Sequence, residues 1–311
     1  MAFSGVELEE VAPSSLPTYG VTIGSKIVIV SPGEYTVFDS DAEESLLYAS
    51  GPGSGLIPPS ISNSNVIYGA ARDLSYPNKY AEACKIDLST NTRTVIFSRT
   101  SNLRVCSDLC ASDTYLFGIF TTNDYGQYSN MRKIAISSPS GLYSEPNMFP
   151  DWIDNTYNNL LMTTVGDRLF LQTKNSTGRS SDIKEINPTD ASIINSISVP
   201  GSYTTPYRGV VYDGYLWWRL ASTTTIALGI NLSSGAIRYV QPTPGGISSS
   251  GGQPVIHDNV MYWVASDNTK VYALDLSSGR WKLDDLPTTR SGRQALAVGN
   301  NKLWIPSTVT P

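Results

Sequence analysis

Residues 253–283 read QPVIHDNVMYWVASDNTKVYALDLSSGRWKL, and this stretch decides the fold. It contains four short runs rich in apolar and aromatic residues, and polar turns of two to four residues separate them. The third run, Lys270 to Leu276, alternates between the two faces of a strand. Four short strands joined by tight turns predict an antiparallel meander, a sheet in which each strand pairs with the next.

The same pattern returns along the whole chain. A small polar turn leads into a short aromatic or aliphatic strand seven times, with the strands at residues 26–30, 66–68, 115–117, 169–171, 216–218, 261–263 and 303–305. The third strand and its turn also return, most clearly at Cys84 to Asn91 and at Leu228 to Gly235. One such unit cannot bury its own apolar face, so it is stable only when it stacks on copies of itself.

The spacing of the units indicates the architecture. First strands begin near residues 19, 60, 106, 160, 209, 254 and 294, so one unit takes 40 to 54 residues. No ten-residue stretch has helical periodicity. We therefore expect an all-β chain that forms one domain over residues 1–311, a seven-bladed β-propeller of four-stranded antiparallel blades.

The last unit supplies only two strands before the chain stops at Pro311. Residues 4–12 alternate as a strand does, and we expect them to be the outermost strand of the blade that begins near residue 294. Both termini would then close the ring and leave no exposed sheet edge there. The alternative is a terminal tail beside a two-stranded last blade.

The sixth unit resembles a kelch repeat. The matching residues are Asp275-Leu276-Ser277-Ser278-Gly279-Arg280-Trp281, then Leu286-Pro287 and Arg290. The second and fifth units match in part and the others poorly, and Val264-Ala265 stands where kelch repeats carry a double glycine. The resemblance supports a propeller and assigns no kelch function.

Composition excludes several classes of partner. The chain has 22 Lys and Arg against 27 Asp and Glu, a net charge of −5, with no basic cluster for nucleic acid. No segment approaches the roughly 18 apolar residues of a membrane span, and the N-terminus does not read as a signal peptide. We expect Cys84, Cys106 and Cys110 to be small buried residues in a reducing compartment.

The sequence gives little support for catalysis. The single histidine, His257, is placed in a turn by its Asp258-Asn259 neighbours, and no nucleophile elbow or phosphate-binding glycine loop is present. A calcium loop starting at Asp39 would lack the glycine and distal glutamate of the known pattern. We expect no enzyme activity, no metal and no cofactor, although paired carboxylates among Asp124, Asp151 and Asp154 leave a polysaccharide-cleaving enzyme open.

Candidate binding residues gather in the longer loops, which join second to third strands and one blade to the next. These loops carry tyrosines, a tryptophan and acids among Asn, Ser and Gly, and such residues make good recognition surfaces and sugar platforms. The candidates are Tyr76, Tyr80, Tyr125, Tyr128, Trp152, Tyr157, Tyr203, Asp124, Asp151 and Asp154. The alternative is that these aromatic rings only cap the blades.

The first functional hypothesis is a non-enzymatic propeller that binds other proteins of a larger assembly through this loop rim. Its low charge and its Asn, Ser, Thr and Tyr content resemble structural or adsorption proteins of bacteriophage particles, which implies a virion location. The alternatives are a glycan-binding propeller, a polysaccharide hydrolase or lyase, and a cytosolic kelch-like adaptor. A cytoplasmic or an extracellular location remains open with them.

Overall fold

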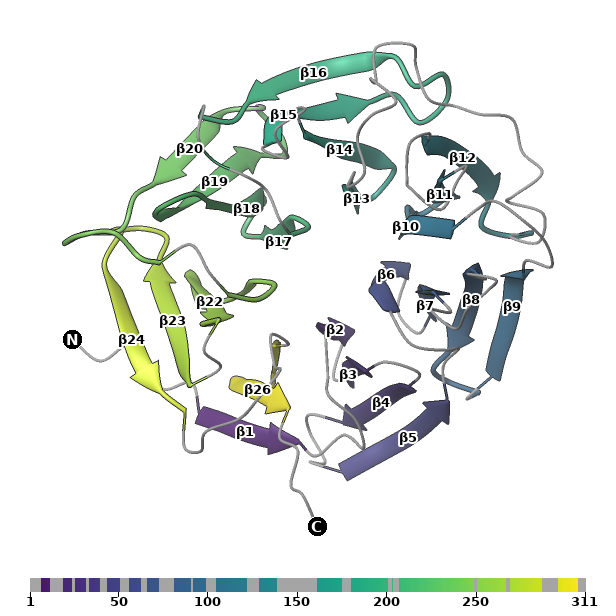
Figure 1. The fold of residues 1–311 in the computed structure, drawn as a ribbon, viewed down its shortest axis with the longest axis horizontal. Coiled ribbons are helices and arrows are strands. Elements are labelled where there is room, and N and C mark those ends of the chain that lie inside the picture. The colour runs from purple at the N-terminus through teal and green to yellow at the C-terminus, as the bar shows by residue number, and fades with distance from the viewer. Residues whose placement is uncertain are drawn as a thin grey trace. The chain divides into compact units, whose positions relative to one another are not determined.

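The computed structural model describes the strands and many of the turns between them. The described residues are 7–11, 19–23, 26–31, 34–39, 44–50, 56–62, 66–72, 81–90, 92–98, 105–121, 129–138, 161–174, 180–200, 203, 207–248, 251–266, 269–286 and 296–306. They form β-strands in seven sheets and no helix (Figure 1). The chain is therefore all-β, as predicted, and it divides into two compact units.

The first unit comprises residues 1–31, 35–48 and 205–311. It holds three four-stranded sheets and the terminal sheet. The first four-stranded sheet comprises β2 (Tyr19–Ile23), β3 (Lys26–Ser31), β4 (Glu34–Asp39) and β5 (Glu44–Ser50). The other two comprise β17 (Val210–Tyr212), β18 (Tyr215–Ala221), β19 (Thr225–Asn231) and β20 (Ile237–Val240), and β21 (Val255–His257), β22 (Val260–Val264), β23 (Lys270–Asp275) and β24 (Trp281–Asp285). The terminal sheet comprises β1 (Glu7–Val11), β26 (Lys302–Pro306) and β25 (Ala297–Gly299).

Two ends of the chain build the terminal sheet. Strand β1 runs parallel to β26, with Glu7 opposite Lys302 and Val11 opposite Pro306, and β26 pairs antiparallel with β25. The strand order β1-β26-β25 therefore places the N-terminal strand at the edge of this sheet.

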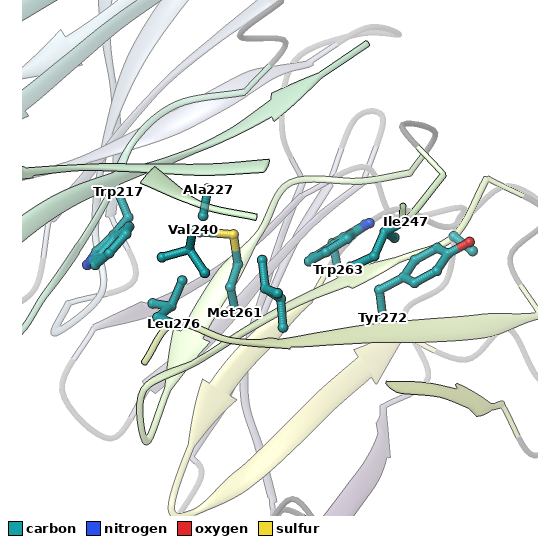
Figure 2. Close-up of a cluster of buried hydrophobic side chains, with 10 residues drawn as sticks. Trp217, Ala227, Val240, Ile247, Met261, Trp263, Tyr272 and Leu276 are labelled. Atoms are coloured by element: carbon teal, nitrogen blue, oxygen red, sulfur yellow. The ribbon is translucent and has the colours of Figure 1, made fainter. Parts of the chain in front are cut away.

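The sheets of the first unit pack face to face in a row. Met261 and Trp263 on one face of β22 contact Trp217 and Ala227 of the β17–β20 sheet (Figure 2). The other face of the β21–β24 sheet packs on β26 through a cluster that includes Val260, Tyr262, Leu303 and Ile305. The terminal sheet in turn covers β3 through Ala297, Trp304, Ile27 and Ile29. Because successive strand residues point to opposite faces, one strand such as β22 supplies both interfaces.

The second unit comprises residues 32–34 and 49–204. Its sheets are β6 (Leu56–Ser62), β7 (Val66–Arg72), β8 (Ala81–Asp87) and β9 (Thr92–Ser98); β10 (Val105–Ala111), β11 (Tyr115–Thr121) and β12 (Ser129–Ala135); and β13 (Leu161–Val165), β14 (Arg168–Lys174), β15 (Ser180–Ile186) and β16 (Ile193–Ser198). Strand β10 lies against β6 and β7 on one side and against β13 on the other.

A buried carboxylate helps to join two sheets of this unit. Asp108 of β10 is fully buried, and its Oδ2 atom accepts a hydrogen bond of 2.6 Å from the backbone N–H of Met162 in β13. Phe117, Met131, Met162 and Leu169 pack in the same interface. Cys84 and Cys110 are buried, which confirms this part of the prediction for these two cysteines.

The turns explain why these residues form hairpins. In Asp213-Gly214, Asp258-Asn259 and Asn300-Asn301 both residues have positive φ, between 45° and 71°. This is the two-residue turn whose twist matches that of paired strands, and it favours Asn, Asp and Gly. In two of the turns between third and fourth strands, Asn231 and Asp275 accept hydrogen bonds from the backbone N–H groups of the serines that follow them. Gly235 and Gly279 end these turns with φ values of 70° and 71°.

Candidate binding edge

Every sheet has two different rims, one at each end of its strands. At the first, which we call the turn edge, strand one joins strand two and strand three joins strand four through short turns such as 213–214 and 232–236. At the opposite edge, which we call the connection edge, the chain enters strand one and passes from strand two to strand three. Connections at this edge include 73–80, 122–128, 175–179 and 241–254.

Neighbouring sheets within a unit have their turn edges side by side. In the first unit, the backbone N–H of Asn259 donates to the Tyr212 hydroxyl at 2.8 Å, and His257 Nε2 lies 2.7 Å from Asn301 Oδ1. In the second unit, the backbone N–H of Thr114 donates to Asp167 Oδ1 at 3.0 Å. Since the turn edges align, the connection edges of the same sheets align as well.

Most of the predicted binding residues belong to connections whose strand ends are described. Tyr76 and Tyr80 lie between β7 and β8, and Asp124, Tyr125 and Tyr128 lie between β11 and β12. Asp151, Trp152, Asp154 and Tyr157 precede β13. These nine residues lie outside the described residues, so their assignment as binding residues stays a prediction.

Tyr203 is the one predicted binding residue that the structure describes. It is half-buried, and its backbone N–H donates a hydrogen bond of 2.9 Å to the carbonyl of Pro200.

The connection 241–254 is described except for residues 249 and 250, and hydrogen bonds and packing hold its described part in place. The backbone N–H of Thr225 donates to the Ile247 carbonyl at 2.9 Å, and the buried Ile247 side chain joins the cluster around Trp263 (Figure 2). The Trp281 indole donates to the Pro244 carbonyl at 3.1 Å. Thr243, Gly245 and Ser248 remain exposed, so this connection offers backbone groups and small polar side chains to solvent.

A buried arginine lies beneath the same edge. Arg219, near the end of β18, is only 1% exposed, and its guanidinium lies 4.7 Å from the centre of the Tyr207 ring and 5.4 Å from that of Trp263. Its Nη2 atom donates to the Gly251 carbonyl at 3.2 Å, and the Tyr207 hydroxyl donates to the same carbonyl. This group was not expected from the sequence.

His257 has a structural contact. The sequence placed it in a turn, which is wrong, because His257 is the last residue of β21 and the turn follows at 258–259. Its bond to Asn301 joins two neighbouring sheets at the turn edge, away from the connections. In the described part of the chain, no three His, Cys, Asp or Glu side chains gather as they would around a metal ion. Nor does any described segment form a helix that is long and apolar enough to cross a membrane.

No protein-family model and no curated protein matches this sequence. Solved structures resemble its fold. A structure from an analysis of two prolyl endopeptidases aligns with 87% of this chain and 42% of its own, at 16% identity and a TM-score of 0.56, so the chain spans about 42% of that protein. The computationally designed Ika8 protein aligns over 96% of both chains at 12% identity and a TM-score of 0.60. Hydrazine synthase of Kuenenia stuttgartiensis aligns over 94% of this chain and 92% of its own, at 9% identity and a TM-score of 0.60. At these identities the likeness concerns the fold alone.

Proposed function

We propose that this chain is a seven-bladed β-propeller that works as a non-enzymatic binding and structural module. Its partner would meet the connection edge, where the long aromatic-bearing segments leave the sheets. Rigid scaffolds commonly carry their binding loops at one end, because the scaffold fixes the loops that it joins.

One observation carries this proposal: neighbouring sheets in each unit have the same orientation. The bonds from Asn259 to Tyr212 and from Thr114 to Asp167 hold turn edge beside turn edge. The long connections of those sheets then share one side of the unit. A sheet such as β21–β24, covered on both faces by other sheets, has the packing that every blade of a propeller needs.

The proposed setting is a bacteriophage particle, in which the chain would serve as a tail, decoration or adsorption protein. The support is compositional: charged residues are only 16% of the chain, and the long connections are rich in Asn, Ser, Gly and Tyr. Partners would be other proteins of the particle, with a surface glycan as the second candidate because sugar faces stack on aromatic rings.

Assembly of particles tests this function. The chain would be co-expressed with the genes that flank its own gene, and the purified particles would be analysed for its presence. We expect Tyr125→Ala and Trp152→Ala to lower its incorporation, because both alter the connection edge. The matched control is Tyr239→Ala, which removes an exposed ring from the outer strand β20 and should leave incorporation unchanged.

Two outcomes would contradict the proposal. Incorporation that survives both connection-edge changes but is lost on Asp213→Lys would place the contact at the turn edge. Turnover of a polysaccharide by the purified chain, abolished by Asp151→Asn or Asp154→Asn, would make it an enzyme. A glycan array with the same variants separates a sugar partner from a protein partner.

A further inference from the structure

Arg219 stands out because a charged side chain occupies a strand that is otherwise apolar on both faces. Leu216, Trp217, Trp218 and Leu220 around it are buried, and Arg219 itself is 1% exposed. Burying a cation costs free energy unless its surroundings compensate for the lost water. The groups that surround it should therefore have a reason to be there.

These groups come from four different segments of the first unit. Tyr207 precedes β17, Arg219 lies near the end of β18, Trp263 near the end of β22, and Gly251 in the connection that enters β21. The guanidinium lies against both aromatic rings, where the negative ring faces stabilise a cation. Its Nη2 atom and the Tyr207 hydroxyl both donate to the Gly251 carbonyl. One side chain thus bridges the connections that enter two adjacent sheets.

Arg219 keeps its charge at neutral pH. Burial lowers the pKa of Arg219 to about 10, and Tyr207 opposes this shift. The cation is therefore present to contact both rings. The same contacts would be weaker for a neutral side chain of equal length.

The backbone at Gly251 is fitted closely to this arrangement. Gly251 has a φ of 139°, and a Cβ atom there would lie 2.8 Å from Trp263 Cδ1 and overlap the Val264 carbonyl oxygen. The next residue, Gly252, donates its backbone N–H to that Val264 carbonyl at 2.9 Å. The connection can approach the end of β22 only with glycine at this position.

We propose that Arg219 is a positioning residue, which orders the segments entering β17 and β21 and so sets the form of the connection edge in the first unit. It acts through Tyr207, Trp263 and the Gly251 carbonyl and makes no contact with the partner itself. The inference rests on the proposed function only for its consequence in binding, since the ordering of the two segments is a property of the chain alone.

Hydrogen exchange of the isolated chain tests this ordering without any partner. In Arg219→Met, we expect amides of residues 251–253 to exchange at least about tenfold faster, because the bond to Gly251 and both cation–ring contacts are lost. Amides of β19 and β23 should change far less. Tyr207→Phe keeps the ring but removes one donor, so exchange of the same amides should rise about fivefold.

Arg219→Lys separates positioning from simple filling of space. Lysine keeps the charge but lacks the planar, forked donor group, so it should restore part of the protection lost in Arg219→Met. Equal acceleration in all amides of the β17–β24 region, or no change at residues 251–253, would overturn the proposal. If Arg219→Met does not fold, Tyr207→Phe and Arg219→Lys give the same decision. Incorporation of Arg219→Lys into particles is measured in a separate experiment. If the proposed function is wrong, the hydrogen-exchange result still tests the positioning role of Arg219.

Discussion

The backbone N–H of Asn259 donates a hydrogen bond of 2.8 Å to the hydroxyl of Tyr212, which belongs to the neighbouring sheet. Asn259 has a φ of 61° and lies in the turn between β21 and β22, whereas Tyr212 ends β17. The bond joins two turn edges and so helps to set the relative orientation of two sheets in the first unit.

We expect Tyr212→Phe to lower the free energy of unfolding by about 1 kcal/mol, because a partly buried backbone donor loses its partner. Chemical denaturation measures the change, and Ile194→Val on the exposed surface of β16 is the control, expected within about 0.5 kcal/mol of the parent chain. Equal effects of the two variants would show that the inter-sheet bond contributes nothing.

Gly235 and Gly279 form a matched pair in repeated turns. Both have φ near 70°, but a Cβ atom on Gly235 would meet nothing within 4 Å, whereas one on Gly279 would overlap the Gln241 carbonyl oxygen. We expect Gly235→Ala to cost about 1 kcal/mol from backbone strain alone, and Gly279→Ala to cost at least about 2 kcal/mol. Denaturation midpoints of the two variants check this order. The reverse order would mean that the β20-to-β21 connection does not lie against this turn.

Asp87 gives the chain an acid-sensitive turn. Hydrogen bonds from the Ser89 hydroxyl and the Ser89 backbone N–H lower the pKa of the exposed Asp87 carboxyl below its ordinary value of 3.8. A depressed pKa in the folded state adds stability that is present above pH 3.8 and is lost as the pH falls below it. Asn231 occupies the equivalent turn position, so Asp87→Asn should preserve the turn at pH 7.

The expected result of Asp87→Asn is a smaller loss of stability between pH 7 and pH 3 than in the parent chain. Urea denaturation at both pH values measures it. A variant that loses stability with acid as steeply as the parent would contradict the role of this carboxylate.

The N-terminal strand should protect the terminal sheet. Strand β1 pairs along β26 from Glu7 opposite Lys302 to Val11 opposite Pro306. Deletion of residues 1–12 would expose the backbone groups of β26, and exposed strand edges pair with other chains. We expect a lower thermal midpoint and more self-association in sedimentation, whereas deletion of residues 307–311 should change neither. A monomeric deletion variant of unchanged midpoint would show that the pairing contributes no stability.

Much of the fold could be predicted from sequence because the decisive signals are local. The turn Asp258-Asn259 is a strong hairpin signal, and the alternation through Val260–Val264 fixes which side chains face which neighbour. Trp217 and Trp218 are both buried, although neighbouring residues of a strand point to opposite faces. Strand β6 begins at Leu56, earlier than residue 60, because a strand at the edge of its sheet with a bulge between Ile57 and Ser60 accommodates Pro58 and Pro59.

The contacts between sheets could not be predicted in the same way. His257 and Asn301 are 44 residues apart, and their bond depends on two turns lying side by side. The hydrogen bond from Arg219 to Gly251 spans 32 residues, and the burial of Arg219 results from packing between two sheets. A single charged residue in a strand does not indicate such a site unless both faces of that strand are already known to be covered.

The central proposal is that seven sheets surround one axis with all their connection edges on one side. A crystal structure of the purified chain that resolves the strand spacing of about 4.8 Å tests this most directly. The claim predicts that every sheet lies between two others and that Tyr76, Tyr125 and Trp152 line the same side of the molecule. A flat two-layer stack of sheets, or connection edges that lie on opposite sides, would contradict it.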